Sequence, residues 1–382
     1  MSPYFDFNAT TPLSAVARDA WLLASQTHWQ NPSSLYRDAG FTSQKLEAAR
    51  ERLATLLGCD DAERIVFTSG TTESNNALFF SIARSLPKDA RIAISTIEHP
   101  SVREAARAVF RDRIIEIPVN QDGVVELERV HDVLQNDRPA LVSIMAANNE
   151  SGTLQPWREI SALCKSSGVF FHTDAAQWIG KLPSGDLGHC DSISGSGHKF
   201  GGPKGVGFLV LRDPAQNLSF LRGGPQEQGH RAGTENYPSI EAMVAALEWI
   251  EPRLDAVVVE QTLLREEFCD AMRHAFPGVR FIGRGTERLW NTVLMVMPEH
   301  ENLKWLTRLS RRGFSISTGS ACSSGKEGSS VVVQALGASA DDLRRVVRVS
   351  GGWDHTRGDW QALAGAFVEV QEELKRGGKG QP

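Results

Sequence analysis

The chain has few cysteines, and their spacing matches no structural cysteine motif. There are five in 382 residues, an odd number, spread widely and without a C-x-x-C pair. Such usage indicates neither a disulfide framework nor a zinc site, so we expect reduced thiols that mostly fill the core. The five are Cys59, Cys164, Cys190, Cys269 and Cys322.

Long apolar runs and a strong charge of either sign are also missing. No stretch approaches the about 20 apolar residues of a membrane-spanning helix, and the first residues do not join a basic segment to an apolar one. The formal net charge is −5, and the one short basic cluster, at 375–379, is interpreted as a frayed terminus. These absences predict a soluble, cytoplasmic protein with no nucleic-acid partner and no membrane partner.

The composition is that of a globular protein, with 41% hydrophobic and 23% charged residues. From about residue 43 to 211, amphipathic stretches typical of helices alternate with short β-branched runs typical of strands. This alternation predicts an α/β fold with a mostly parallel central sheet flanked by helices. A long amphipathic stretch at 239–268 then leads into mixed helices and strands. We therefore expect a large domain at 13–250 and a smaller α+β domain formed by 1–12 and 251–382.

A lysine lies in a glycine-rich turn just before a predicted strand. Lys199 follows Ser-Gly-His and precedes Phe-Gly-Gly, where the backbone must pass close to a neighbour. Its amine is placed to form a Schiff base with a carbonyl cofactor. Taken alone, the same pattern is more often a solvated loop charge.

A carboxylate ends the predicted buried strand that precedes this turn. Asp174 lies where open α/β sheets place their chemistry, at the carboxyl end of a strand. An acid there can keep a pyridinium nitrogen protonated, which makes the ring an electron sink. An aspartate that caps the following turn explains the residue equally well.

Polar residues follow three other predicted strands. Thr71 and Thr72 open a helix, where free N–H groups and the helix dipole attract an anion such as phosphate, although an ordinary N-cap has the same pattern. His99 can stack on a flat ring and shuttle protons, although an isolated histidine is more often structural. Asn149 offers hydrogen bonds to a ligand or forms an Asx turn.

Together these groups fit a pyridoxal-phosphate site better than independent coincidences do. In its motifs and their order, from Phe5 to about Ser350, the chain resembles the cysteine desulfurase family of class V, fold-type I pyridoxal-phosphate enzymes. The resemblance implies that family's transferase fold, with the cofactor on the large domain. The motifs that carry it are Gly70-Thr71-Thr72-Glu73-Ser74-Asn75-Asn76, Glu98-His99-Pro100, Asn148-Asn149-Glu150-Ser151-Gly152, His172-Thr173-Asp174-Ala175-Ala176-Gln177, Ser196-Gly197-His198-Lys199 and Arg231-Ala232-Gly233-Thr234-Glu235-Asn236.

The resemblance gives each matching residue a role at the cofactor. It implies that Lys199 forms the Schiff base, that Asp174 pairs with the pyridine nitrogen and that His99 stacks on the ring and moves protons. It also implies that Gln177 bonds the phenolic oxygen. Further cofactor contacts are implied for Thr72, Ser196 and His198 at the phosphate, with Thr71 in the same turn, for Asn149, and for Thr234 reaching into the other subunit of a homodimer.

Cys322 lies among small residues, within a serine- and glycine-rich stretch at 315–330. Such a segment packs little apolar surface and is expected to be mobile, which favours an exposed reactive thiol over a buried hydrophobe. The resemblance implies that Cys322 takes sulfur from the cofactor-bound substrate as a persulfide. It also implies that the freed Lys199 removes the α-proton and that alanine is released.

The resemblance also identifies substrate contacts. Arg348 matches the arginine that binds the substrate carboxylate, a task that suits a guanidinium because it offers two parallel donors; a salt-bridged strand arginine is the alternative. Asn31 and Asn149 are further implied contacts. Two segments depart from the family pattern, namely 35–38, where a histidine is usual, and 351–356.

We therefore predict a pyridoxal 5'-phosphate-dependent cysteine desulfurase that converts L-cysteine to L-alanine. The persulfide on Cys322 would serve iron–sulfur cluster assembly or another sulfur-acceptor or scaffold protein. The nearest alternatives on the same scaffold are a selenocysteine lyase and a cystine-type lyase. Two alternatives belong to other classes. Lys199 and Asp174 argue against a noncatalytic sulfur-transfer scaffold, and the phosphate-like turn and His99 argue against a cofactor-free Schiff-base aldolase.

Overall fold

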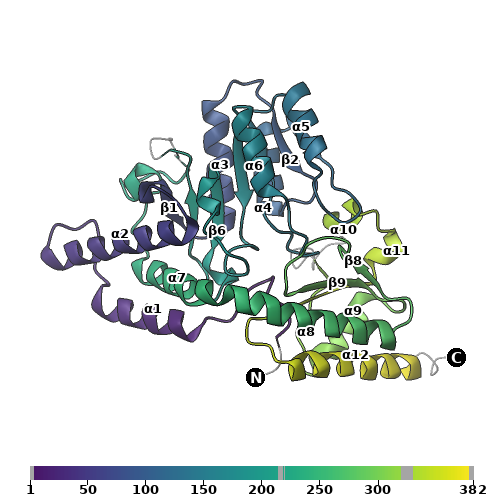
Figure 1. The fold of residues 1–382 in the computed structure, drawn as a ribbon. Helices are drawn as coiled ribbons and strands as arrows, with labels where there is room; N and C mark the ends of the chain where they lie inside the picture. Colours follow the sequence, from purple (N-terminus) through teal and green to yellow (C-terminus); the bar gives the residue numbers. More distant parts are fainter. Residues whose placement is uncertain (1–3, 214–217, 219, 320–329, 378–382) are drawn as a thin grey trace.

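The computed structural model describes residues 4–213, 218, 220–319 and 330–377 (Figure 1). Its larger sheet has seven strands in the order β1-β7-β6-β5-β4-β2-β3. The pairs among β2 to β6 are parallel, whereas β7 runs antiparallel to both β1 and β6, so the mostly parallel sheet expected from the sequence is confirmed. The strands are β1 (Ile65–Thr68), β2 (Ile92–Ser95), β3 (Ile114–Ile117), β4 (Leu141–Ser143), β5 (Phe170–Asp174), β6 (Ser192–Ser196) and β7 (Gly207–Val210).

Helices cover both faces of this sheet, as its buried strands require. They are α2 (Arg37–Leu57), α3 (Thr71–Ser85), α4 (Pro100–Phe110), α5 (Leu127–Asn136), α6 (Trp157–Ser166) and α7 (Tyr237–Ile250), with α1 (Ala15–Thr27) packed on α7. Side chains alternate between the two faces along each strand. In β1, Ile65 and Phe67 join the core formed with α2, α5, α6 and α7, whereas Val66 joins the core formed with α3 and α4.

A second sheet of three antiparallel strands has the order β10-β9-β8. One face packs on long helices through Val347 and Val349, and the other packs on short helices through Val346. The N-terminal segment adds bridges from Tyr4 and Asp6 beside this sheet. The elements are β8 (Arg280–Ile282), β9 (Thr292–Val296), β10 (Val346–Ser350), the long helices α8 (Leu254–Ala275), α9 (Asn302–Arg311) and α12 (Arg357–Gly377), and the short helices α10 (Val331–Ala335) and α11 (Ala340–Leu343).

The predicted amphipathic stretch at 239–268 forms two helices. A 3₁₀ turn, Glu251–Arg253, separates α7 from α8, and it contains a proline that lacks the N–H an uninterrupted helix needs. The two helices run one after the other along the base of the molecule, from the large sheet to the small one (Figure 1). The domain boundaries given above stay a prediction.

The composition predicted that the chain has no membrane-spanning helix and that its cysteines mostly fill the core. Across the described ranges, no helix is long and apolar enough to span a bilayer. Cys164, Cys190 and Cys269 are buried and Cys59 is half-buried, and these four described thiols form no disulfide. Most cysteines therefore do fill the core. The cytoplasmic location stays a prediction.

Candidate active site

A cavity of about 600 Å³ opens at the carboxyl ends of the central strands. Its walls come from the segments that follow β1, β2, β4, β5 and β6, together with the N-terminal segment and residues near the small sheet. Parallel strands end at one edge of a sheet, which is why groups far apart in sequence meet here. The predicted site residues that line it are Thr71, Thr72, His99, Asn149, Asp174, Gln177, Ser196, His198, Lys199 and Arg348.

One end of the cavity is suited to an anion. Helix α3 begins after Gly70, whose φ of 147° suits glycine, and no side chain caps its first N–H groups. The Thr71 hydroxyl is buried without a partner. The Ser196 hydroxyl lies beside Gly70, where an added Cβ would come within 3.3 Å of it. An uncapped helix start and an unpaired hydroxyl are what a phosphate group would satisfy.

His198 lies at the same end and bonds the N-terminal segment. Its Nδ1 is 3.1 Å from the Thr10 hydroxyl. Burial, together with the positive charges of Lys199 and Lys204, lowers the pKa of His198 to about 4. The imidazole is therefore neutral near pH 7 and offers one N–H donor.

The buried carboxylate of Asp174 is held by two donors. The Asn75 side chain donates to Oδ2 at 3.0 Å, and the Ala176 N–H donates to Oδ1 at 3.0 Å. Asn75 is itself fixed, because it donates to Ser101 and accepts from Ser194. These bonds aim an acceptor at the cavity, where it can pair with a protonated ring nitrogen.

The sequence analysis did not assign a role to Asn75. A signal was present, since Asn75 stands four residues after Thr71 on α3 and so shares its helix face. Asparagine is also unfavourable inside a helix, away from its cap, so its presence there indicates that its side chain makes specific hydrogen bonds.

His99 caps α4 and is oriented by Ser101. The Ser101 N–H donates to His99 Nδ1 at 3.1 Å, and the Ser101 hydroxyl lies 2.8 Å from the same atom. With Nδ1 as acceptor, the neutral ring carries its proton on Nε2. Burial lowers the pKa of His99 and Lys199 adds to this, while Asp174 opposes it. The neutral ring therefore offers an Nε2–H hydrogen-bond donor to a ligand in the cavity.

Lys199 ends a 3₁₀ turn, Gly197–Lys199, that follows β6. Its Nζ donates to the carbonyl oxygens of Asn8 at 2.6 Å and Ala9 at 2.9 Å. The glycines around it leave no room for side chains, because a Cβ on Gly202 would come 2.9 Å from the Gly197 carbonyl oxygen. The turn therefore fixes the lysine backbone and leaves the amine at the cavity.

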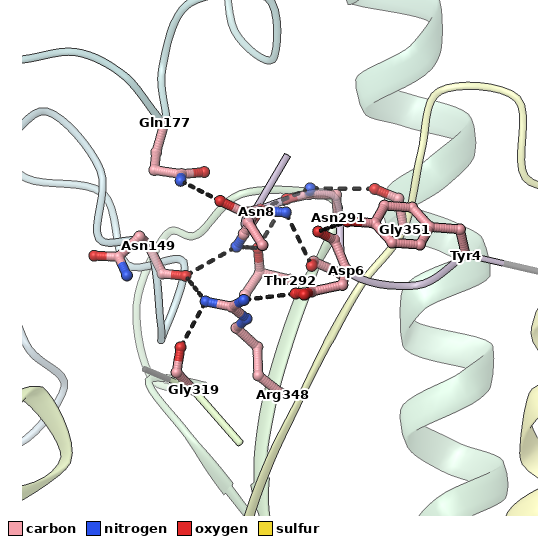
Figure 2. A network of polar contacts seen from close by, with 12 residues as sticks. Tyr4, Asp6, Asn8, Asn149, Gln177, Asn291, Thr292, Gly319, Arg348 and Gly351 are labelled. Atoms are coloured by element: carbon pink, nitrogen blue, oxygen red, sulfur yellow. Dashed lines mark hydrogen bonds and ion pairs between the residues drawn. The ribbon is translucent and has the colours of Figure 1, made fainter. Parts of the chain in front are cut away.

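Asn8 connects several of these groups (Figure 2). Its carbonyl oxygen accepts from Lys199 and, at 2.9 Å, from the Gln177 amide. Its side chain donates to the Asn149 carbonyl at 3.1 Å and to the Thr292 hydroxyl at 2.8 Å. The sequence analysis missed Asn8. The only signal is local, since polar Asn8 lies in an otherwise strand-like segment.

Arg348 projects from β10 and is almost completely buried, with 1% of its surface exposed. Its Nη1 donates to the carbonyl oxygens of Asn149 at 2.9 Å and Gly319 at 2.7 Å, and Nη2 pairs with Asp6 Oδ1 at 2.6 Å (Figure 2). Its Nε is buried without a partner. The guanidinium is thus fixed in place and keeps an unused donor for a carboxylate.

Two predicted residues that the structure describes, Asn31 and Thr234, do not line this cavity. Asn31 is exposed, and its side chain accepts from the Ser33 N–H. Thr234 is exposed and lines a separate cavity of about 60 Å³. Cys322 lies outside the described residues. The described residues on either side of its segment do contact the cavity wall, because Gly319 accepts from Arg348 and the Ser330 hydroxyl donates to Glu150 at 2.5 Å.

Residues 3–363 match the family model Aminotransferase class-V. The chain belongs to this family. Within it, a cysteine desulfurase IscS from Dictyoglomus turgidum is 34% identical over 377 residues, covering 97% of this chain and 95% of that protein. A cysteine desulfurase from Cereibacter sphaeroides is 37% identical over 376 residues, covering 97% and 96%.

Solved structures agree with this membership. A NifS-like protein superposes with a TM-score of 0.88 at 30% identity, covering 97% of this chain and 100% of that chain. SspA in complex with cysteine superposes with a TM-score of 0.79 at 30% identity, covering 91% and 98%. The predicted fold-type I architecture and the resemblance to cysteine desulfurases are therefore confirmed.

As a class V family member related to cysteine desulfurases, the chain is a pyridoxal-phosphate enzyme that transfers sulfur. The residues that line the cavity also fit this cofactor. The unpaired Thr71 hydroxyl at an uncapped helix start suits the phosphate, and the buried Asp174 carboxylate suits the ring nitrogen. Lys199 supplies the amine.

Proposed function

We propose that this chain is a cysteine desulfurase that takes sulfur from L-cysteine, releases L-alanine and holds the sulfur as a persulfide on Cys322. One observation carries the proposal. A single cavity holds the amine of Lys199, the carboxylate of Asp174 and the guanidinium of Arg348. On either side of the cysteine segment, Gly319 and Ser330 bond to two residues of the cavity wall, Arg348 and Glu150. The substrate sulfur, the base and the accepting thiol can therefore come together at this cavity.

The assignment of cofactor contacts follows the chemistry of the cavity. The phosphate is assigned to Thr71, Thr72, Ser196 and His198, and the ring to Asp174, His99 and Gln177, with Asn149 beside it. Pyridoxal phosphate, when bound, draws electrons away from the carbon that carries the substrate amine. The task of the protein is then to orient the substrate and to move protons.

Lys199 is the proposed base. Its amine lies in the cavity, where it can take the α-proton of a bound substrate. The carbonyl oxygens of Asn8 and Ala9, at 2.6 and 2.9 Å from Nζ, can hold the resulting ammonium group, because each accepts a charge-assisted hydrogen bond. The lysine therefore has a defined position in its protonated form.

Arg348 is the proposed site of the substrate carboxylate. Three acceptors already fix the guanidinium, so little conformational freedom is lost when a carboxylate binds the remaining donors. The unpaired Nε supports this assignment, since a buried donor without a partner is costly until a ligand occupies it. Asn149 lies beside it at the cavity wall.

The other four cysteines are poor nucleophiles, which supports Cys322 as the sulfur acceptor. Burial raises the pKa of Cys59 and Cys269 to about 11, and that of Cys164 and Cys190 to about 12. The thiolate is the reactive form, so these thiols are unreactive near neutral pH. Position 322 is three residues from Gly319, and three residues of chain reach at most about 10 Å.

The proposed transfer is balanced in atoms and electrons. The Cys322 thiolate attacks the substrate sulfur, the new S–S bond forms, and the C–S bond breaks with its electron pair remaining on the carbon side. Protonation of that carbon gives alanine. The sum is L-cysteine plus thiol giving L-alanine plus persulfide, from which a sulfur-acceptor or scaffold protein can then draw.

We also propose that the enzyme is a homodimer with Thr234 reaching the partner's cavity. Thr234 is exposed and lies outside its own cavity, which is expected of a residue that acts in a second copy. Large apolar side chains are exposed from residue 13 to residue 41, a stretch that contains α1 and the first turn of α2, and a second copy would bury them. They are Leu13, Val16, Trp21, Leu22, Leu23, Trp29, Leu35, Tyr36 and Phe41.

The test follows alanine and persulfide in the same reaction. Purified protein with pyridoxal phosphate and L-cysteine is expected to form alanine, with a persulfide mapped to Cys322. Cys322→Ser should abolish both, whereas Cys269→Ser, a matched change at a buried thiol, should keep both. Lys199→Ala should lose the visible absorbance of the lysine-bound cofactor.

Other outcomes contradict specific parts of the proposal. Alanine without a persulfide on Cys322 would refute the role of that thiol but not the cofactor assignment. Turnover of selenocysteine that survives in Cys322→Ser, with loss of cysteine turnover, would favour the selenocysteine lyase. A colourless protein without activity would favour the noncatalytic scaffold.

A further inference from the structure

Lys181 is a buried lysine that the proposed reaction does not use. Only 1% of its surface is exposed, and it does not line the cavity. Its Nζ donates to the side-chain oxygen of Gln177 at 2.7 Å and lies 3.4 Å from the Gln177 backbone oxygen. Lysines are rarely buried, and when they are they usually pair with a carboxylate. A buried lysine amine bonded to an amide therefore indicates a specific role.

The Lys181 bond determines which way the Gln177 amide points. The Lys181 amine donates to Oε1, and the Asn8 carbonyl, which can only accept, takes the amide nitrogen, so the oxygen faces Lys181 and the nitrogen faces the other way. That nitrogen donates to the Asn8 carbonyl at 2.9 Å, as Figure 2 shows. Gln177 lines the cavity, and its second N–H is the donor left for a ligand.

The backbone around Lys181 is fixed as well. The indole N–H of Trp353 donates to the Gly180 carbonyl at 2.8 Å, and that of Trp290 donates to the Lys181 carbonyl at 2.7 Å. Gly180 has a φ of 72°, and a Cβ there would come within 2.2 Å of the Phe200 side chain. Trp353 lies in a segment that departs from the family pattern, and this bond gives that residue a structural role.

The charge state of Lys181 is consistent with a neutral donor. Burial, with the positive charges of Lys199 and Arg348, lowers the pKa of Lys181 well below its usual value. A neutral amine still donates to an amide oxygen, and it avoids the cost of a buried, unpaired charge.

We propose that Lys181 is a positioning residue that locks the Gln177 amide so that an N–H, and not the carbonyl oxygen, faces the cavity where the phenolic oxygen of the cofactor is assigned. This inference rests on the proposed function. A donor there stabilises the negatively charged phenolic oxygen, whereas an amide oxygen would repel it. Lys181 therefore affects the protonation of the bound cofactor through Gln177, without touching it.

The test compares Lys181→Met in two backgrounds. Methionine has a similar length but no donor, so the Gln177 amide loses one of the two contacts that orient it and keeps only the Asn8 carbonyl. We expect the pH midpoint of the visible absorbance band of the bound cofactor to rise by about one pH unit, the size of one lost hydrogen bond to a charged group. In the Gln177→Ala background, Lys181→Met should add no further shift, because the residue through which Lys181 acts is already gone.

Several results would overturn the proposal. Equal shifts in both backgrounds would mean that Lys181 acts by its own charge or on the fold, and an unchanged midpoint in Lys181→Met would mean that the amide does not need it. Should Lys181→Met fail to fold, Gln177→Glu keeps the lysine but offers no N–H donor. It must raise the midpoint likewise, and an unchanged midpoint would refute the donor orientation.

The same measurement separates this inference from the proposed function. A wild-type protein that shows no visible band with pyridoxal phosphate overturns the cofactor assignment, and the role of Lys181 with it. A normal band whose midpoint does not respond to these substitutions overturns only the role of Lys181.

Discussion

Asp6 Oδ1 lies 2.6 Å from Arg348 Nη2, so the arginine assigned to the substrate carboxylate already has a counter-ion within the protein. The two residues are 342 positions apart in the chain. The arginine side chain is nearly inaccessible, whereas 17% of the aspartate side chain remains exposed. A buried guanidinium without a partner would be costly, so the pair stabilises the site before a substrate binds. The same carboxylate also competes with a substrate carboxylate for the positive potential of Arg348.

Asp6→Asn is expected to lower the KM for L-cysteine several-fold. Asparagine keeps the acceptor oxygen but removes the negative charge, while Asn149 and Gly319 still hold the guanidinium. An anionic substrate then meets a stronger positive potential. Steady-state kinetics at low ionic strength measures this. A raised KM would show instead that the charge of Asp6 is needed to position the arginine.

Arg348→Lys is expected to reduce kcat/KM by roughly ten- to a hundredfold, mostly through KM. Lysine keeps the charge but cannot make the parallel donor contacts, and a hydrogen bond to a charged group contributes about 1.5–3 kcal/mol. Arg345→Lys is the matched control, because that residue lies outside the cavity and bonds the Pro298 carbonyl. A wild-type KM in Arg348→Lys would contradict the assignment of the substrate carboxylate.

Glu98→Gln is expected to change how stability depends on pH. Burial raises the pKa of Glu98 to about 8, although Ser95 and Met145 donate to its Oε1. A carboxyl whose folded-state pKa lies above its unfolded value contributes stability at low pH and loses it as pH rises from about 4.5 to about 8. Glutamine cannot ionise and does not lose this contribution.

The free energy of unfolding of Glu98→Gln should therefore rise relative to wild type by roughly 3 kcal/mol between pH 5 and pH 8. Urea unfolding at several pH values measures the difference. Glu104→Gln, at an exposed helix position, controls for the loss of one negative charge. A difference that does not vary with pH would show that Glu98 is ionised in the folded protein.

Glu227→Gln is expected to destabilise the fold by about 3–5 kcal/mol, because the buried Arg50 loses its buried counter-ion and keeps only the half-exposed Glu47. Glu227 pairs with Arg50 at 2.8 Å, both side chains are buried, and it accepts the Phe67 N–H at 2.7 Å. This pair anchors the segment that leads to Thr234. Glu241→Gln, in the more exposed pair with Arg52, should cost no more than about 1 kcal/mol. Equal losses in the two variants would contradict the argument from burial.

The elements with strong local signals were predictable from the sequence. Helix α4 (Pro100–Phe110) begins at a proline, and strands β3 (Ile114–Ile117) and β10 (Val346–Ser350) are short runs rich in β-branched residues. A proline in the first turn of a helix and short β-branched runs are local features that act without the rest of the fold. β6 (Ser192–Ser196) has no such signal, because serine and glycine are poor strand formers. It exists because the central sheet buries it, with Phe208 filling the space beside Gly195.

The sequence by itself determined the family, the α/β alternation and the polar residues at strand ends, because parallel strands bring those ends to one edge wherever such a sheet forms. Only the tertiary structure decided which groups support them. Asn8 behind Lys199, Asp6 on Arg348 and Lys181 on Gln177 all follow from how the chain packs. Two of these contacts join residues more than 190 positions apart, and no periodicity encodes them. The Lys181 contact joins residues only four positions apart in a turn. Its role still depends on burial, which only the packed core creates.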